Sequence, residues 1–230
     1  MMKDTTKLEE TIGVMFSDKS LLTQALVHRS YLNEHPSFPI GQNERLEFLG
    51  DAVLELVVTE DLYANYPNPE GELTNWRAAL VNAKILSEIA HETTLEQFLY
   101  LSHGEAKDAE SKARQYILAN AFEALIGAIY LDQGMKKASE FIHRFVLVRL
   151  PYILENQLHL DPKSRFQESA QERAGVTPTY RVLDEHGPDH AKQFTVGVYL
   201  GDEKIAEGQG TSKQEAQIAA AAEGLKAKGW

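Results

Sequence analysis

The spacing of apolar residues changes along the chain and divides the sequence into two parts. Over residues 8–158, apolar side chains recur at intervals of three and four residues, which is the period of an amphipathic α-helix. Segments rich in proline, glycine and asparagine interrupt this pattern and predict the connections between helices. The helices are expected over residues 21–27, 46–58, 80–90, 117–131 and 141–150.

The C-terminal part combines a helical pattern with an alternating one. Asp161 and Pro162 fit the N-cap and first turn of a helix, and Ser212 and Glu215 fit a capping box at the start of another. Between them, apolar and polar residues alternate, as is typical of half-buried strands. The expected elements are a helix over 163–174, strands over 180–183, 194–200 and 204–207, and a helix over 212–226.

These patterns predict an all-α domain over residues 1–155, a linker over 156–160 and a small α+β domain over 161–230 with the order α-β-β-β-α. The 230 residues contain no cysteine, which excludes disulfide scaffolds, cysteine nucleophiles and thiolate zinc sites. No run of about 18 apolar residues is present, so we expect no membrane span. The polar N-terminus lacks the apolar core of a signal peptide, and we therefore expect a cytoplasmic protein.

The distribution of charge bears on nucleic acid as a partner. The chain has 23 basic and 34 acidic side chains, and its net charge of −11 at first argues against such a partner. Residues 1–155 hold 14 basic and 23 acidic side chains, a net charge of −9, whereas residues 156–230 hold 9 and 11, a net charge of −2. The acidity therefore belongs mostly to the helical part.

One predicted helix carries a stripe of acidic residues. At about 100° per residue, four carboxylates fall within a sector of roughly 80°; they are Glu44, Glu47, Asp51 and Glu55. Such a stripe is most often a solvated surface. Three apolar residues lie on the same face, which suggests that a second subunit covers it; they are Phe48, Leu54 and Val58. The stripe expected to face the core consists of Leu46, Leu49, Val53, Leu56 and Val57.

A second predicted helix, over residues 116–131, is apolar nearly all round and is expected to be buried. Asn120 and Glu123 lie on one face of it, and Gly127 continues that face. A buried carboxylate without a partner is costly. An internal ion pair would satisfy Glu123, but this helix offers no base. A divalent cation held by several carboxylates fits better, and Mg²⁺ near a phosphate backbone suggests metal-assisted phosphodiester cleavage.

Residues 43–54, which read NERLEFLGDAVL, resemble the signature of the ribonuclease III family of double-strand-specific endoribonucleases. Residues 161–228 resemble the double-stranded-RNA-binding domain that follows the nuclease domain in bacterial members. Further segments match the family in its order; they are residues 25–30, 70–74, 77–81 and 122–132.

The resemblance implies a homodimer with one catalytic valley, in which Glu47, Asp51 and Glu123 are the principal metal-binding carboxylates. Glu44 and Glu70 correspond to accessory acids of the valley, and Phe48 to the aromatic residue that inserts into the other subunit. The resemblance further implies Mg²⁺ as the cofactor, with Mn²⁺ as a substitute. Cleavage would leave 5′-phosphate and 3′-hydroxyl ends with a short 3′ overhang, in precursors of ribosomal RNA and in messenger RNA.

The chain departs from the family at two places in this domain. Asn120 stands where bacterial members usually carry aspartate, and its amide oxygen can still bind a metal or position a metal-bound water. We therefore count Asn120 among the catalytic and metal-binding residues. Residues 107–111 replace a glycine pair that members often carry.

In the C-terminal domain, the resemblance implies three contacts with the minor grooves and phosphates of double-stranded RNA. The contact residues are Gln167, Glu168 and Gln171 on the first helix, Pro188 and His190 in the first turn between strands, and Ser212 and Lys213 at the last helix. Members often carry a lysine cluster at the start of this last helix, where residues 212–217 of the chain contain one lysine. Because phosphate contacts supply much of the affinity, we expect residues 156–230 alone to bind double-stranded RNA weakly.

Two other interpretations deserve a test. A ferritin-like di-iron site is suggested by two Glu-x-x-His pairs, but both pairs lie opposite the apolar stripes of their helices; the pairs are Glu88 with His91 and Glu140 with His143. A non-catalytic RNA-binding member of the family is supported only by Asn120. The retention of the three principal carboxylates argues against it.

Overall fold

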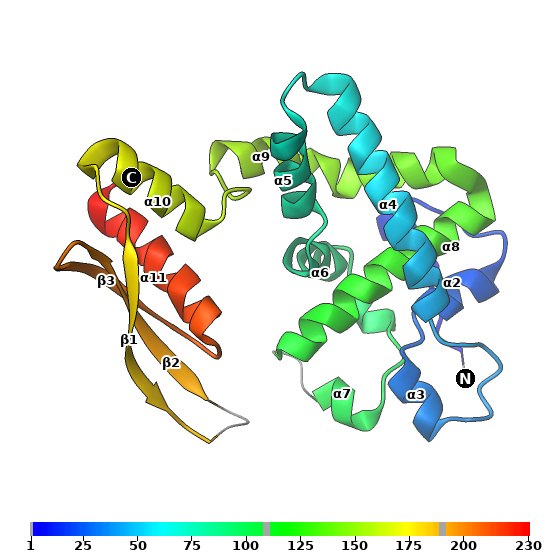
Figure 1. The fold of residues 1–230 in the computed structure, drawn as a ribbon. Helices are drawn as coiled ribbons and strands as arrows, with labels where there is room; N and C mark the ends of the chain where they lie inside the picture. The colour runs from blue at the N-terminus through cyan, green and yellow to red at the C-terminus, as the bar shows by residue number, and fades with distance from the viewer. Residues whose placement is uncertain (1, 108–110, 189–191) are drawn as a thin grey trace. The chain divides into compact units, whose positions relative to one another are not determined.

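The computed structural model describes residues 2–107, 111–188 and 192–230 and divides the chain into two compact units, Met1–His159 and Leu160–Trp230 (Figure 1). The first unit is helical and the second combines helices with a sheet, which confirms the predicted fold class. The elements of the first unit are α1 (Thr6–Ile12), α2 (Lys19–Ala25), α3 (Arg29–Glu34), α4 (Glu44–Asn65), α5 (Glu70–Leu80), α6 (Ala83–Glu92), η1 (Leu95–Phe98), α7 (His103–Lys107), α8 (Lys112–Phe145), η2 (Leu147–Arg149) and α9 (Leu150–Glu155).

Two glycines allow α4 and α8 to pack closely at the centre of this unit. A Cβ atom on Gly50 would lie 1.8 Å from the carbonyl oxygen of Glu123, and a Cβ atom on Gly127 would lie 2.3 Å from the carbonyl oxygen of Leu46. Both distances are far shorter than real contacts, so only glycine fits at this crossing. The close approach brings the acidic face of α4 beside Glu123 of α8.

The core-facing stripe of α4 differs from the prediction. Leu54 and Val58 were expected to be covered by a second subunit, but they are fully buried within the chain. Leu56 was expected in the core, but it is 55% exposed. The reason is that α4 contacts α2, α5 and α8, which together cover a wider face than a single stripe. Phe48 alone of the three apolar residues on the acidic face is exposed, at 80%.

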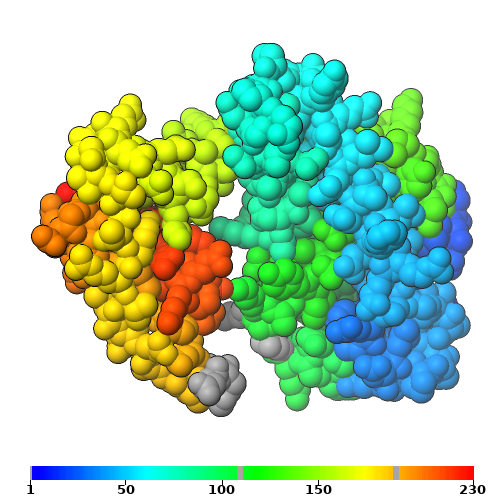
Figure 2. Space-filling model, in the orientation of Figure 1, coloured from blue at the N-terminus to red at the C-terminus, as the bar shows by residue number. Residues whose placement is uncertain are grey.

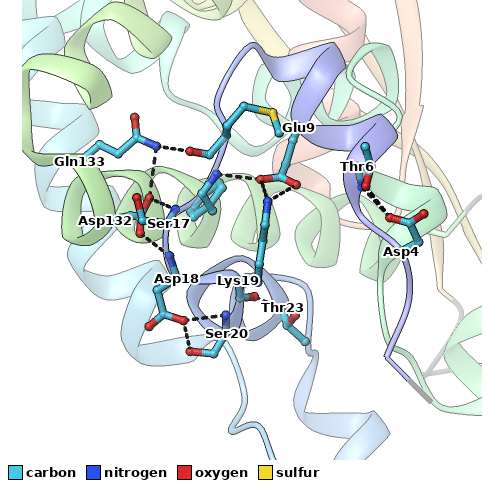
Figure 3. A network of polar contacts seen from close by, with 12 residues as sticks. Asp4, Thr6, Glu9, Ser17, Asp18, Lys19, Ser20, Thr23, Asp132 and Gln133 are labelled. Carbon is cyan, nitrogen blue, oxygen red and sulfur yellow. Dashed lines mark hydrogen bonds and ion pairs between the residues drawn. The ribbon is translucent and has the colours of Figure 1, made fainter.

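Polar contacts fasten the loop before α2 to the middle of α8 (Figure 3). The Asp132 carboxylate accepts hydrogen bonds from the backbone N–H groups of Ser17 and Asp18, at 2.9 and 2.8 Å. The buried Glu9 carboxylate accepts from the backbone N–H of Phe16 at 2.7 Å and from Lys19 Nζ. Two residues after Asp132, α8 bends at Gly134, whose φ of 79° lies in the left-handed region.

The second unit places two helices on one face of a three-stranded sheet. Its elements are α10 (Pro162–Ala174), β1 (Thr179–His186), β2 (Gln193–Leu200), β3 (Glu203–Gly210) and α11 (Lys213–Lys228). The strands are antiparallel in the order β1-β2-β3 and are longer than predicted. The predicted caps are present, because Asp161 accepts from the N–H of Ser164 and Ser212 Oγ accepts from the N–H of Glu215. The core consists of Phe166, Val198, Ala220, Ala221 and Leu225.

No helix within the described ranges is long and apolar enough to cross a membrane.

Candidate active site

A cavity of about 880 Å³ opens where the acidic face of α4 meets α8. Figure 2 shows the blue-to-cyan surface of α4 directly beside the green surface of α8. Part of the lining comes from residues that the sequence singled out, namely Glu44, Glu47, Phe48, Asp51, Asn120 and Glu123. The four predicted catalytic side chains, Glu47, Asp51, Asn120 and Glu123, thus line one cavity. They come from two helices about 70 residues apart in the chain.

Mutual repulsion and burial dominate the electrostatics of this cavity. Burial, together with the charges of Asp51, Glu47 and Glu55, raises the pKa of Glu123 to about 8. Burial and the charges of Glu44 and Asp51 also raise the pKa of Glu47. The pKa of Asp51 is raised by burial and by the charge of Glu55. A carboxyl group whose pKa is about 8 is mostly protonated at neutral pH. The positive charges around the cavity are therefore too few to keep all of its carboxyl groups ionised.

Asn120 moderates this repulsion. Its side-chain amide donates a hydrogen bond to Glu47, which lowers the pKa of that carboxyl group against the other influences. An aspartate at this position would instead add a further negative charge. The amide therefore reduces the charge of the cavity and still presents a neutral oxygen.

The bases around the cavity do not compensate the carboxylates near Glu123. Among the described lining residues, Arg29 is the one permanent cation, and it lies 3.6 Å from Glu44. His28 also lines the cavity, but burial lowers its pKa, and its Nδ1 contacts Ser30 Oγ at 2.8 Å. Neither residue is predicted from the sequence to belong to the site, because no helical pattern links residues 28–30 to α4.

The donor set of the cavity consists of oxygen atoms, which suits a hard divalent cation such as Mg²⁺ or Mn²⁺. In the part of the chain that the structure describes, however, no three carboxylate or imidazole groups converge closely enough to hold one ion. The chemistry of Glu47, Asp51, Asn120 and Glu123 fits a cation by charge and by ligand type.

Two residues predicted to belong to the site do not point into the cavity of Glu123. Glu70 begins α5 and lines a separate cavity of about 440 Å³, together with Tyr63 and Arg77, and its carboxylate accepts a hydrogen bond from Thr74 Oγ1 at 3.0 Å. Within one chain, Glu70 is therefore not part of the cavity of Glu123, and its role as an accessory acid stays a prediction. Phe48 projects from the rim of the larger cavity into solvent.

Tyr116 is a lining residue that the sequence analysis missed. It lies four residues before Asn120 on α8, and residues at this spacing share a helix face. The spacing could therefore have identified it.

The predicted RNA contacts of the second unit lie at its surface. Gln167, Glu168 and Gln171 lie on the exposed face of α10, and Pro188 and Lys213 are also exposed. Ser212 is exposed as well and caps α11. His190 lies outside the described residues, as do three of the residues in the 107–111 segment that replaces the glycine pair.

The di-iron interpretation fails because its ligands are separated and paired with other groups. Glu88 lies 3.8 Å from Arg149, and His91 lies 2.7 Å from Glu96. On α8, Glu140 pairs with Lys137 and His143 with Asp61, each at 3.1 Å.

Comparisons with known proteins found matches to both units of the chain. Residues 18–150 match the Ribonuclease-III-like family, and residues 162–227 match the double-stranded RNA binding motif. The chain is 42% identical to Ribonuclease 3 of Dehalococcoides mccartyi over 226 residues, covering 98% of this chain and 95% of the relative. It is 45% identical to Ribonuclease 3 of Chloroflexus aurantiacus over 224 residues, covering 96% and 90%.

A solved structure is also similar to the first unit. It is the nuclease domain of ribonuclease III from Campylobacter jejuni, described as showing structural flexibility in a region involved in dimer formation. The TM-score is 0.58 at 40% identity, and the match covers 64% of this chain and 99% of that one. On these matches and on the carboxylate cavity, the chain belongs to the ribonuclease III family and is an endoribonuclease.

Proposed function

We propose that the chain cleaves double-stranded RNA in a Mg²⁺-dependent reaction at the cavity between α4 and α8. The observation that carries this proposal is the group of carboxylates that lines one cavity around the half-buried Glu123, whose pKa is raised to about 8. Glu47, Asp51, Asn120 and Glu123 would hold the cation. When bound, a divalent cation supplies Lewis-acid stabilisation of the phosphate and lowers the pKa of a bound water.

The residues of the chain prepare the cavity for this chemistry. Glu123 holds a proton in the metal-free protein at neutral pH, and this proton must leave before its carboxylate can ligate an ion. The Asn120 amide orients Glu47 by donating a hydrogen bond to it. Arg29 neutralises Glu44 at the rim, which reduces the repulsion that an approaching phosphate meets.

We further propose a homodimer in which each chain cuts one strand, leaving 5′-phosphate and 3′-hydroxyl ends with a short 3′ overhang. The exposure of Phe48 supports an interface at the rim of the cavity, because a large apolar side chain at 80% exposure gains by being covered. Glu44 and Glu70 would serve as accessory acids of the joint valley. The dimer formation described for the Campylobacter jejuni nuclease domain is consistent with this arrangement.

For the second unit, we propose binding of double-stranded RNA through the exposed residues of α10, the turn between β1 and β2, and the start of α11. The matched motif over residues 162–227 supports this role. We assign residues 1–155 to the nuclease domain, 156–160 to a linker and 161–230 to the RNA-binding domain. The family membership further favours precursors of ribosomal RNA and structured messenger RNA in the cytoplasm as substrates.

The test is the cleavage of a long, perfectly paired RNA by the full chain with Mg²⁺, with Mn²⁺ and with a chelator. We expect cleavage only with a divalent cation. Because the metal contributes several kcal/mol, Glu123→Ala should lower the rate by about 100-fold or more. Glu88→Ala, which alters a carboxylate paired with Arg149 outside the cavity, is the matched control and should retain activity. Duplex binding without cleavage under all conditions would instead support the non-catalytic interpretation.

A further inference from the structure

One carboxylate of the second unit contacts two lysines that come from different segments. Glu185, near the end of β1, lies 2.6 Å from Lys192 through its Oε1 atom. Its Oε2 atom lies 3.9 Å from Lys213, the first residue of α11. The side chain thus connects the end of the β1–β2 connection with the beginning of the last helix.

A β-bulge gives Glu185 the orientation that this contact requires. Val182 pairs with Val196, but Asp184 pairs with Thr195 and Glu185 with Phe194, so that Leu183 is an extra residue in β1. Without the extra residue, Glu185 would lie on the opposite face from Val182. With it, Glu185 shares the face of Phe194 and Val198, which is the face covered by the helices. Bulges commonly redirect a side chain in this way.

The neighbours of Lys213 complete this arrangement. The Nζ atom of Lys213 lies 5.6 Å from the centre of the Phe194 ring. Phe194 is the residue that pairs with Glu185 across the two strands. The two lysines lower the pKa of Glu185, first through the hydrogen bond from Lys192 and then through their charges. Lys213 thus contacts a carboxylate and an aromatic ring that both belong to the sheet.

We propose that Glu185 is a positioning residue that holds Lys213, and with it the start of α11, beside Lys192 and Phe194 at the start of β2 for contact with double-stranded RNA. This inference rests on the proposed function, in which these two segments contact the duplex. It predicts an unusual sign: removing this negative charge from an RNA-facing surface weakens binding. A purely electrostatic role predicts the opposite, because a carboxylate near phosphates opposes association.

The experiment measures the affinity of the full chain for a perfect RNA duplex of about 16 base pairs, the length that one such module spans. A chelator prevents cleavage, and salt concentration is varied. Because exposed ion pairs contribute up to about 1 kcal/mol, we expect Glu185→Gln to weaken binding about threefold or more. The dependence of log affinity on log salt should become shallower, since fewer lysines reach phosphates.

Two variants separate position from charge. Glu185→Asp keeps the charge but is shorter by about 1.5 Å, one C–C bond, so it should also weaken binding. Glu203→Gln removes one charge from an ion pair with Lys228, at the opposite end of α11, and should bind as tightly as the unaltered chain or more tightly. Unchanged thermal melting of the three variants confirms that the domain stays folded.

The possible results distinguish this inference from the proposed function. Lys213→Met should weaken binding, and if it does not, the proposed RNA contact of Lys213 is wrong and the inference falls with it. If Lys213→Met weakens binding while Glu185→Gln binds as tightly as Glu203→Gln, the positioning role alone is overturned. Weaker binding by both Glu185 variants, with Glu203→Gln unaffected, supports the inference.

Discussion

Acidic side chains have opposite surroundings in the cavity of the first unit and at the surface of the second unit. In the cavity of the first unit, burial and neighbouring carboxylates raise the pKa values of Glu47, Asp51 and Glu123, and the nearby Arg29 pairs with Glu44 instead. In the second unit, acidic side chains at the surface lie beside lysines, as four ion pairs show; these are Glu185 with Lys192, Glu203 with Lys228, Glu207 with Lys204 and Glu223 with Lys226.

This difference explains why the net charge of −11 does not argue against RNA. If these carboxylates hold a divalent cation, as we propose, the cation offsets their charge and the cavity can accept phosphate. Surface carboxylates that pair with lysines lower the net positive charge of the second unit, so they limit its affinity, except for Glu185, which we propose positions Lys213 for binding. The same composition therefore supports a metal-dependent site in one unit and weak electrostatic attraction in the other.

The largest effect is expected from a methyl group at the helix crossing that creates the cavity. Gly50→Ala places a Cβ atom 1.8 Å from the carbonyl oxygen of Glu123, so α4 and α8 must separate. We expect a loss of about 3 kcal/mol or more in the free energy of unfolding, together with loss of cleavage. Denaturant unfolding measures the first quantity. Gly71→Ala, which meets no atom within 4 Å in another helix, is the control, and equal stability of the two variants would refute the crossing argument.

The next effect concerns the pH dependence of stability without metal. The Glu123 carboxyl ionises near its ordinary pKa of 4.5 in the unfolded chain but at about 8 in the folded chain. The folded state therefore binds more protons in this interval, and stability falls as pH rises from about 4.5 to about 8. Glu123→Gln removes this loss, so at pH 8.5 it should be more stable than the unaltered chain by a few kcal/mol, on the order of 3.

Thermal or denaturant unfolding at pH 5 and pH 8.5 measures this difference. Glu185→Gln is the control from the second unit, because the pKa of Glu185 is lowered by Lys192 and Lys213 rather than raised. It should show no gain at high pH. If Glu123→Gln is no more stable relative to the unaltered chain at pH 8.5 than at pH 5, the account of an uncompensated cavity is contradicted.

A smaller effect is expected at the amide that moderates the repulsion. Asn120→Asp adds a carboxylate to the cavity and should lower the Mg²⁺ concentration needed for half-maximal cleavage, by about three- to tenfold as for a ligand of higher charge. Cleavage rates measured across a Mg²⁺ titration give this value. Asn120→Ala, which removes the hydrogen bond to Glu47, should raise it instead. If Asn120→Asp leaves the Mg²⁺ concentration for half-maximal cleavage unchanged, the proposed effect of the amide on metal binding is wrong.

The smallest effect is the salt dependence of RNA binding by residues 156–230 alone. With 9 basic and 11 acidic side chains and few lysines at α11, this fragment should bind a duplex weakly. The slope of log affinity against log salt should be shallow, corresponding to about two phosphate contacts at roughly 0.9 each or fewer. Tight binding with a steep slope would show that the ion pairs of this unit do not limit its attraction to RNA.

The sequence was sufficient for the fold class and for six of the 15 residues that line the cavity, because both depend on residues that recur at helical spacing. Glu47, Asp51, Asn120 and Glu123 were assigned on that basis and through the family resemblance, and they line one cavity. The burial of Leu54 and Val58 was not predicted, since it depends on how many helices surround α4. Helical periodicity gives the direction of a side chain but not the width of the packed face.

Contacts between distant segments were also beyond the sequence. Arg29 enters the cavity from α3, and Glu185 contacts Lys213 only because one extra residue in β1 changes the face on which it lies. A pattern of alternating residues does not reveal such a bulge, because the register depends on the neighbouring strand. Glu70 remains a prediction that a single chain cannot test by its own geometry.

The most direct test of the central claim is a calorimetric titration of the metal-free chain with Mn²⁺ at pH 7, repeated in buffers of different ionisation enthalpy. If the cavity is a cation site with a protonated Glu123, binding should release close to one proton per site, and Glu123→Gln should abolish this release. Binding without proton release, or no binding at the concentrations that support cleavage, would contradict the account.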